Sequence, residues 1–125
     1  MISPTLKKLR YRPGIRVGIH AAPAGFDAQV ATASAVMRAH PREKNLDIVQ
    51  AFFTRRSHLE RSLPRLKASL GPRGILWICY PKGQALATDL SREAIRETVA
   101  QVGLQTVAIV AVDDVWSALR VKPVR

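Results

Sequence analysis

Basic side chains follow two apolar segments of the sequence, at points where buried strands would end. Arg55 and Arg56 come just after LDIVQAFF, and Lys82 follows ILWICYP. A serine that can begin a helix stands after each segment, Ser57 in the first case and Ser91 in the second. Guanidinium groups and the free N–H groups of helix starts both bind phosphate or carboxylate. These segments therefore predict a binding site for an anionic ligand.

The other predicted strand ends add further candidates. His20 ends the run IRVGIH, where its imidazole could act as an acid or base or simply bond to a backbone carbonyl. Gly25 lies in the turn after that run. The candidate ligand-binding residues are His20, Gly25, Arg55, Arg56, Ser57, Tyr80, Lys82 and Asp89. The alternative is that the basic residues are ordinary solvated loop residues.

The remaining chemically capable residues have structural explanations. Adjacent Asp113 and Asp114 could form a carboxylate pair for acid–base work, but aspartates are also common in the turns of hairpins. The three histidines, His20, His40 and His58, lack the short spacing typical of metal ligands. We therefore assign no catalytic residue, no metal site and no cofactor, and whether the chain is an enzyme stays open.

The charge of the chain indicates its partners. Twenty lysines and arginines stand against 9 acidic residues, and the net charge of +11 favours phosphates. The expected partners are an anionic small molecule or a nucleic acid. No apolar run approaches the roughly 18 residues of a membrane span, and the first residues lack the apolar region of a secretory signal. We expect a cytoplasmic protein without membrane insertion, in which Cys79 is a small buried hydrophobe; the oligomeric state is left open.

The elements that position these residues alternate between strands and helices. No repeat or linker divides the chain, so residues 1–125 are expected to form one domain. Strands that are apolar throughout favour a mainly parallel sheet covered by helices on both faces. The predicted fold is α/β and Rossmann-like, with about five to six strands and a C-terminal antiparallel hairpin. The predicted strands are residues 15–20, 35–39, 46–53, 74–80, 106–112 and 115–121, and the predicted helices cover residues 26–33 and follow Ser57 and Ser91.

The helix after Arg56 has the clearest local signals. Ser57 and Glu60 have the spacing of a capping box, and the leucines at 59, 63, 66 and 70 share one face. Pro64 lacks an N–H group and should kink or split the helix. In parallel sheets, ligands bind beyond the carboxyl ends of the strands, so the candidate residues should gather at one edge.

The order of segments resembles a shortened class I methyltransferase, in the stretches KLRYRPGIRVGIHAAPAGF, LDIVQAFF, SLPRLKASLGPRGILWICYPKG, TVAIVAV and VWSALRV. The resemblance implies S-adenosylmethionine held by a glycine-rich turn after the first strand and by an acid that ends the second. Here the turn contains one glycine, Gly25, beside Pro23, and no acid follows the second strand before Glu43. A small or degenerate methyltransferase is therefore an alternative function.

A second resemblance covers nearly the whole chain. It is to a bacterial family known only as a domain of unknown function, number three thousand fifty-two, and it rests on P-G-x-R-V at 13–17, A-P-x-G-F at 22–26, Y-P-K at 80–82, T-D-L at 88–90 and D-D-x-W-S-A-L-R at 113–120. That resemblance implies no activity. The leading prediction is a non-enzymatic domain that binds an anionic ligand or partner at the carboxyl edge of the sheet. A nucleic-acid-associated binding protein and the methyltransferase are the alternatives.

Overall fold

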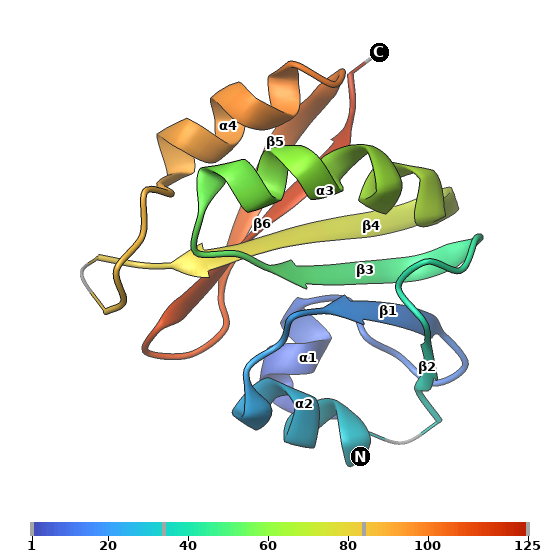
Figure 1. Cartoon of the computed structure of the whole chain (residues 1–125). Helices are drawn as coiled ribbons and strands as arrows, with labels where there is room; N and C mark the ends of the chain where they lie inside the picture. Colours follow the sequence, from blue (N-terminus) through green and yellow to red (C-terminus); the bar gives the residue numbers. More distant parts are fainter. Residues whose placement is uncertain (1, 34, 84, 125) are drawn as a thin grey trace.

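The computed structural model describes residues 2–33, 35–83 and 85–124, which form a six-stranded sheet with helices on both faces (Figure 1). The strands are β1 (Arg16–His20), β2 (Met37–Ala39), β3 (Leu46–Phe52), β4 (Leu70–Pro81), β5 (Leu104–Ala111) and β6 (Trp116–Pro123). The helices are α1 (Pro4–Lys8), α2 (Ala24–Ala31), α3 (Arg56–Ser69) and α4 (Arg92–Ala100). No helix in the described part of the chain is long and apolar enough to cross a membrane.

The strand order is β2-β1-β3-β4-β6-β5, and it places a switch point beside β1. β1 pairs in parallel with β2 on one side and with β3 on the other. β4 continues the parallel set, whereas β6 is antiparallel to both β4 and β5. A doubly wound sheet of order 3-2-1-4-5-6 contains the same run of four parallel strands, 2-1-4-5, and this sheet differs from it in the antiparallel β6 that lies next to β4. The predicted Rossmann-like fold and its closing antiparallel hairpin are confirmed.

Two hydrophobic cores cover the two faces of the sheet. Successive side chains of a strand point to opposite faces. In β4, Trp77 accordingly joins the core beneath α1 and α2, while Ile78 joins the core beneath α3 and α4. Phe26 of α2 belongs to the first core, and Leu63 of α3 belongs to the second. These two layers hold the carboxyl ends of β1 and β3 in fixed positions.

The start of α3 differs from the prediction. The helix begins at Arg56, so Ser57 already lies within its first turn and the predicted capping box is wrong. Asp89 supplies the cap from another part of the chain, because its Oδ1 accepts a hydrogen bond of 2.7 Å from the Arg56 N–H. Pro64 lies inside one continuous helix, so of the two expected effects the split is wrong, while the kink stays a prediction. Leu63 and Leu66 beside it are buried, and this packing holds the helix together.

Two further elements differ from the prediction. β5 is an edge strand, with Val107 43% and Ile109 45% exposed, although an apolar strand was expected to be buried on both faces. The reason is that β6 inserts between β4 and β5. The short helix α1 was not predicted. Ser3 is its N-cap, with a hydroxyl that accepts from the Leu6 N–H at 3.2 Å, and the helix buries Leu6 completely.

Candidate functional site

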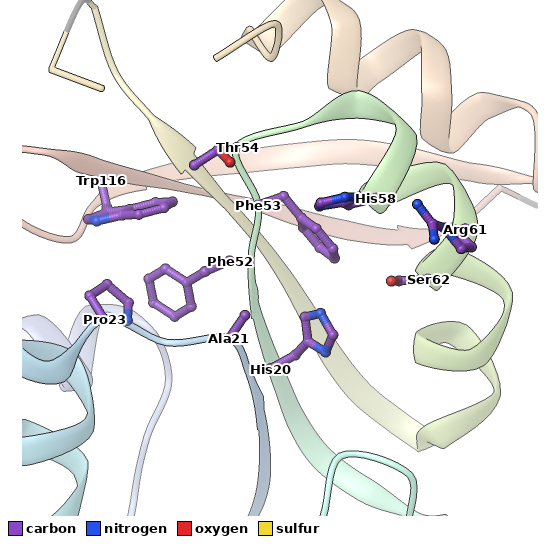
Figure 2. A pocket seen from close by; sticks show the side chains of 10 residues that line it. All are labelled: His20, Ala21, Pro23, Phe52, Phe53, Thr54, His58, Arg61, Ser62 and Trp116. Carbon is purple, nitrogen blue, oxygen red and sulfur yellow. The ribbon is translucent and has the colours of Figure 1, made fainter. Parts of the chain in front are cut away.

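A cavity of about 460 Å³ lies at the carboxyl ends of β1 and β3, the strands that meet at the switch point (Figure 2). Its volume falls within the roughly 300–1,000 Å³ range of small-molecule pockets. Ten residues line it: His20, Ala21, Pro23, Phe52, Phe53, Thr54, His58, Arg61, Ser62 and Trp116. Open α/β sheets bind ligands at this kind of position, so the cavity is the candidate site.

The cavity has an apolar half and a polar half. Figure 2 shows Pro23, Phe52 and Trp116 on one side of the β3 strand end. His20 and Arg61 lie on the other side, toward α3. One ligand could therefore meet aromatic faces with one part and cationic or hydrogen-bonding groups with another.

Aromatic rings that belong to the core build the apolar half. The Phe52 ring lies edge-to-face against Trp116, with the ring centroids 5.1 Å apart, and 5.1 Å from Phe26. Phe52 is 3% exposed and Trp116 9% exposed. Because the other rings fix their positions, these side chains form a rigid wall. Trp116 thus belongs to the hydrophobic core, and the same ring also lines the cavity.

The turn between β1 and α2 forms one rim of the cavity. Ala21 has a φ of 55°, a left-handed conformation that favours glycine. The turn thus has the backbone conformation of a glycine turn but carries an alanine. Pro23 is the N-cap of α2 and makes no side-chain capping bond, and a Cβ added at Gly25 would meet nothing within 4 Å. The start of α2 is therefore open beside the cavity.

One face of α3 supplies the cationic half. His58, Arg61 and Ser62 have the i, i+3, i+4 spacing of a single helix face and all line the cavity. The ion pairs among the described residues are Arg16–Glu43, Arg38–Asp27 and Arg96–Glu93, and none involves α3. Within that same part of the chain, no acidic residue lines this cavity. The α3 face is therefore a cationic wall without an internal counter-charge.

His20 stands at the end of β1 and faces this wall (Figure 2). Its ring lies 5.3 Å from the ring of Phe53, at a tilt of 32°. Partial burial lowers the pKa of the imidazole from its usual value of 6.5, and the positive charge of Arg65 lowers it further. His20 is therefore mainly neutral at pH 7, and a neutral imidazole has one nitrogen that can accept a proton.

The neighbouring strand end, after β4, is closed by the chain itself. Thr88 Oγ1 donates to the Thr54 carbonyl at 2.6 Å and accepts from the Leu90 N–H at 2.9 Å. Asp89 caps the Arg56 N–H, as described above. A smaller cavity of about 260 Å³ lies here, lined by Thr54, Arg55, Ala87, Thr88 and Asp89. The helix-start donor that was expected to bind an external anion is thus already bonded to an internal carboxylate.

The predicted site residues are therefore divided between two places. Of the eight, His20 lines the larger cavity, whereas Arg55 and Asp89 line the smaller one. Tyr80 is buried, and burial raises the pKa of its hydroxyl. The Lys82 N–H donates to the Val115 carbonyl at 2.8 Å, and Lys82 lines neither of these two cavities. The eight candidates thus do not form one site, and their role in ligand binding stays a prediction.

The remaining chemical candidates have structural roles. Asp113 Oδ1 accepts from the N–H groups of Val115 and Trp116, both at 2.8 Å, as the turn interpretation predicts. Cys79 is buried, accepts a hydrogen bond from Gln50 Nε2, and has its pKa raised by burial to about 12. No group of three potential metal ligands occurs among the described residues. Cys79 is thus a buried side chain, as expected.

Several residues of the larger cavity were missed from the sequence. Phe52 and Phe53 were assigned only to a buried strand, and Arg61 and Ser62 only to a helix. A usable signal was present for α3: His58, Arg61 and Ser62 form a polar stripe beside the leucine stripe, in the first two turns after a strand. A polar stripe in that position faces the carboxyl edge of the sheet.

The fit of S-adenosylmethionine to the cavity can be tested on the side chains present. Aromatic faces suit a sulfonium cation, and a guanidinium suits the carboxylate of the cofactor. The acid that would hold the ribose is missing, because Glu43 binds Arg16 at 3.1 Å and the His40 N–H at 2.6 Å instead. The hydroxyls of Thr54 and Ser62 are the polar groups left for the ribose. The cavity therefore offers partners to the sulfonium and the carboxylate of the cofactor, has no acidic side chain among the described residues for its ammonium, and fits the ribose only weakly.

The strand order and the switch-point cavity define a methyltransferase-like Rossmann fold. Three solved structures resemble it over most of their length. An S-adenosylmethionine-dependent methyltransferase from Thiobacillus denitrificans, in complex with S-adenosyl-L-homocysteine, has a TM-score of 0.61 and 13% identity, covering 98% of this chain and 92% of that one. One from Aquifex aeolicus has a TM-score of 0.59 and 15% identity, covering 98% and 91%. A ribosomal protein methylase from Lactobacillus delbrueckii subsp. bulgaricus has a TM-score of 0.61 and 12% identity, and the match covers 95% of this chain and 74% of that one.

These neighbours correct the leading prediction of function. No family model and no curated protein sequence matches the chain, so its resemblance to the bacterial family of unknown function stays a prediction. The three structures named above are methyltransferases, and the one from Thiobacillus denitrificans is a complex with S-adenosyl-L-homocysteine. The prediction of a non-enzymatic anion-binding domain is therefore wrong. The methyltransferase alternative agrees better with the fold, and at identities of 12–15% the fold is all that these likenesses show.

Proposed function

We propose that this chain binds S-adenosylmethionine in the switch-point cavity and acts as a small methyltransferase. One observation carries the proposal: a cavity of about 460 Å³ lies at the carboxyl ends of β1 and β3, in a sheet whose fold is similar to that of solved methyltransferases. The glycine-like turn at Ala21 and the open start of α2 support it.

Each half of the cavity has a role in this proposal. The cofactor, when bound, supplies an electrophilic methyl group on a sulfonium. The rings of Phe52, Phe53 and Trp116, which lie on both sides of the β3 strand end, offer aromatic faces to that cation and keep water from it. Arg61 pairs with the carboxylate of the cofactor. Thr54 and Ser62 offer hydroxyls to the ribose, so affinity is expected to be lower than with a carboxylate in that place.

The methyl acceptor is part of the same proposal. A net charge of +11 and the unpaired cations of α3 favour an acceptor with acidic groups, either an anionic small molecule or a nucleic acid. Membership of the bacterial family of unknown function and a cytoplasmic location are proposed on the sequence alone.

Ligand binding tests the proposal. Calorimetry and thermal melting are carried out on the full chain with S-adenosylmethionine and with S-adenosylhomocysteine. A ligand at one hundred times its Kd adds about 2.7 kcal/mol of stability, which raises the Tm measurably. No heat of binding and an unchanged Tm with both compounds at millimolar concentration would refute the proposal.

Two serines of α3 provide a matched pair of variants. Ser62→Leu places a larger side chain in the cavity and should abolish binding. Ser57→Leu makes the same change at an exposed position outside that cavity, and binding should be retained. Equal binding by the two variants would place the ligand elsewhere.

A further inference from the structure

We propose that His20 faces the transferred methyl group and is the general base that takes the proton from the acceptor. This inference rests on the proposed function and adds to it a residue and an acceptor class. His20 points into the cavity from the end of β1, between the ring of Phe53 and the cationic face of α3 (Figure 2). Among the described residues that line the polar half of the cavity, His20 is the one that belongs to a strand and has a side chain that can accept a proton.

The imidazole is free to do this work. No hydrogen bond to its ring nitrogens is formed within the described residues, unlike His40, whose Nδ1 accepts from the Arg42 N–H at 3.1 Å. The stacking on Phe53 fixes the plane of the ring without using either nitrogen. A neutral, oriented and unbonded imidazole is the form that a general base requires.

The charges around His20 support the same role. α3 contributes His58, Arg61 and Arg65 on the side that His20 faces, while β3, β6 and the β1–α2 turn contribute no charged side chain to the lining of the cavity. The positive charge of Arg65 favours the neutral imidazole that is ready to accept a proton, and the guanidinium of Arg61 in the cavity lining can stabilise negative charge that develops on an acceptor. The surroundings therefore suit the removal of a proton from a weakly acidic group.

The acceptor class follows from this chemistry. An O–H group of weak acidity loses its proton to a ring nitrogen of His20 as its oxygen forms a bond to the methyl carbon. The bond from that carbon to sulfur breaks, and its electron pair stays on sulfur, which becomes a neutral sulfide. The imidazolium then releases its proton to water, and no further reactant is needed.

A charge comparison tests the position of His20. S-adenosylmethionine carries a positive sulfonium, whereas S-adenosylhomocysteine has a neutral sulfur in the same molecule. The ¹⁵N imidazole signals are titrated by NMR in the free chain and in each complex, and His20→Asn assigns the His20 signals. A His20 that faces the methyl group should have a lower pKa with S-adenosylmethionine than with S-adenosylhomocysteine, because like charges repel. It should also be neutral at pH 7 in both complexes.

The outcomes separate this inference from the proposed function. Equal His20 titrations in the two complexes, or a His20 protonated at pH 7 with the methyl donor bound, would overturn the role of His20 while leaving cofactor binding intact. A larger difference at His58 than at His20 would also overturn it. If neither compound moves any histidine signal and calorimetry shows no binding, the proposed function itself fails.

Discussion

Two regions at the carboxyl edge of the sheet, the end of β4 and the ends of β1 and β3, both carry polar residues next to α3. They differ in whether those residues have hydrogen-bonding or charged partners within the chain. After the end of β4, Asp89 accepts from the Arg56 N–H at the start of α3, and Thr88 donates to the carbonyl of Thr54 just before that helix. At the ends of β1 and β3, His20 and Arg61 face a cavity that contains no acidic side chain from the described residues. Basic residues at the carboxyl edge are therefore a poor indicator of a site. A basic residue that has no acidic partner within the chain is a better indicator of a binding site.

The largest effect is expected at the aromatic wall of the cavity. Phe52→Ala removes a ring that contacts Phe26 and Trp116 inside the core, and such truncations cost about 3–5 kcal/mol. Arg61→Ala, on the opposite wall, should change the free energy of unfolding by less than about 0.5 kcal/mol, because Arg61 is exposed. Urea denaturation measures both. Equal losses would show that the two walls do not differ in their structural role.

A smaller effect is expected at the closed strand end. Asp89→Ala removes the cap of α3 and should cost about 1 kcal/mol, whereas Asp89→Asn keeps an acceptor oxygen and should cost less. The freed N–H groups should then bind an external anion. Inorganic phosphate is expected to raise the Tm of Asp89→Ala more than that of the unaltered chain. An identical response of the two proteins to phosphate would contradict the idea that Asp89 closes an anion site.

Much of the fold could be predicted because each strand has a local sequence signal, a short run of apolar residues. The apolar run before Tyr80 predicts a central strand, and Ser91 does cap α4 by accepting from the Ala94 N–H at 3.0 Å. The cap of α3 could not be predicted, because Asp89 is distant in sequence from Arg56 and only the folded chain brings them together. Local serine spacing therefore pointed to the wrong cap.

The site was harder to predict than the fold. His20 was found because it ends a strand, but its partners come from three other elements: Phe53 from the end of β3, Arg61 from α3 and Trp116 from β6. Each of these residues has an ordinary explanation in its own segment, as core or as solvated helix face. Their convergence depends on the strand order, in particular on β1 lying beside β3, and no single segment encodes that order.

The smallest expected effect is the dependence of stability on pH at His20. Its pKa in the folded chain is lowered by burial and by Arg65, while the unfolded chain has the usual value near 6.5. As the pH falls from above 6.5 toward the folded pKa, the unfolded state binds a proton that the folded state does not, so stability is lost over that window. The glutamine of the His20→Gln variant cannot be protonated, so the variant does not lose stability by this route as the pH falls. Urea denaturation between pH 8 and pH 5 should therefore show the unaltered chain losing more stability than the variant, by a modest amount because the ring is only half-buried; parallel losses would show that the cavity does not disfavour charge on His20.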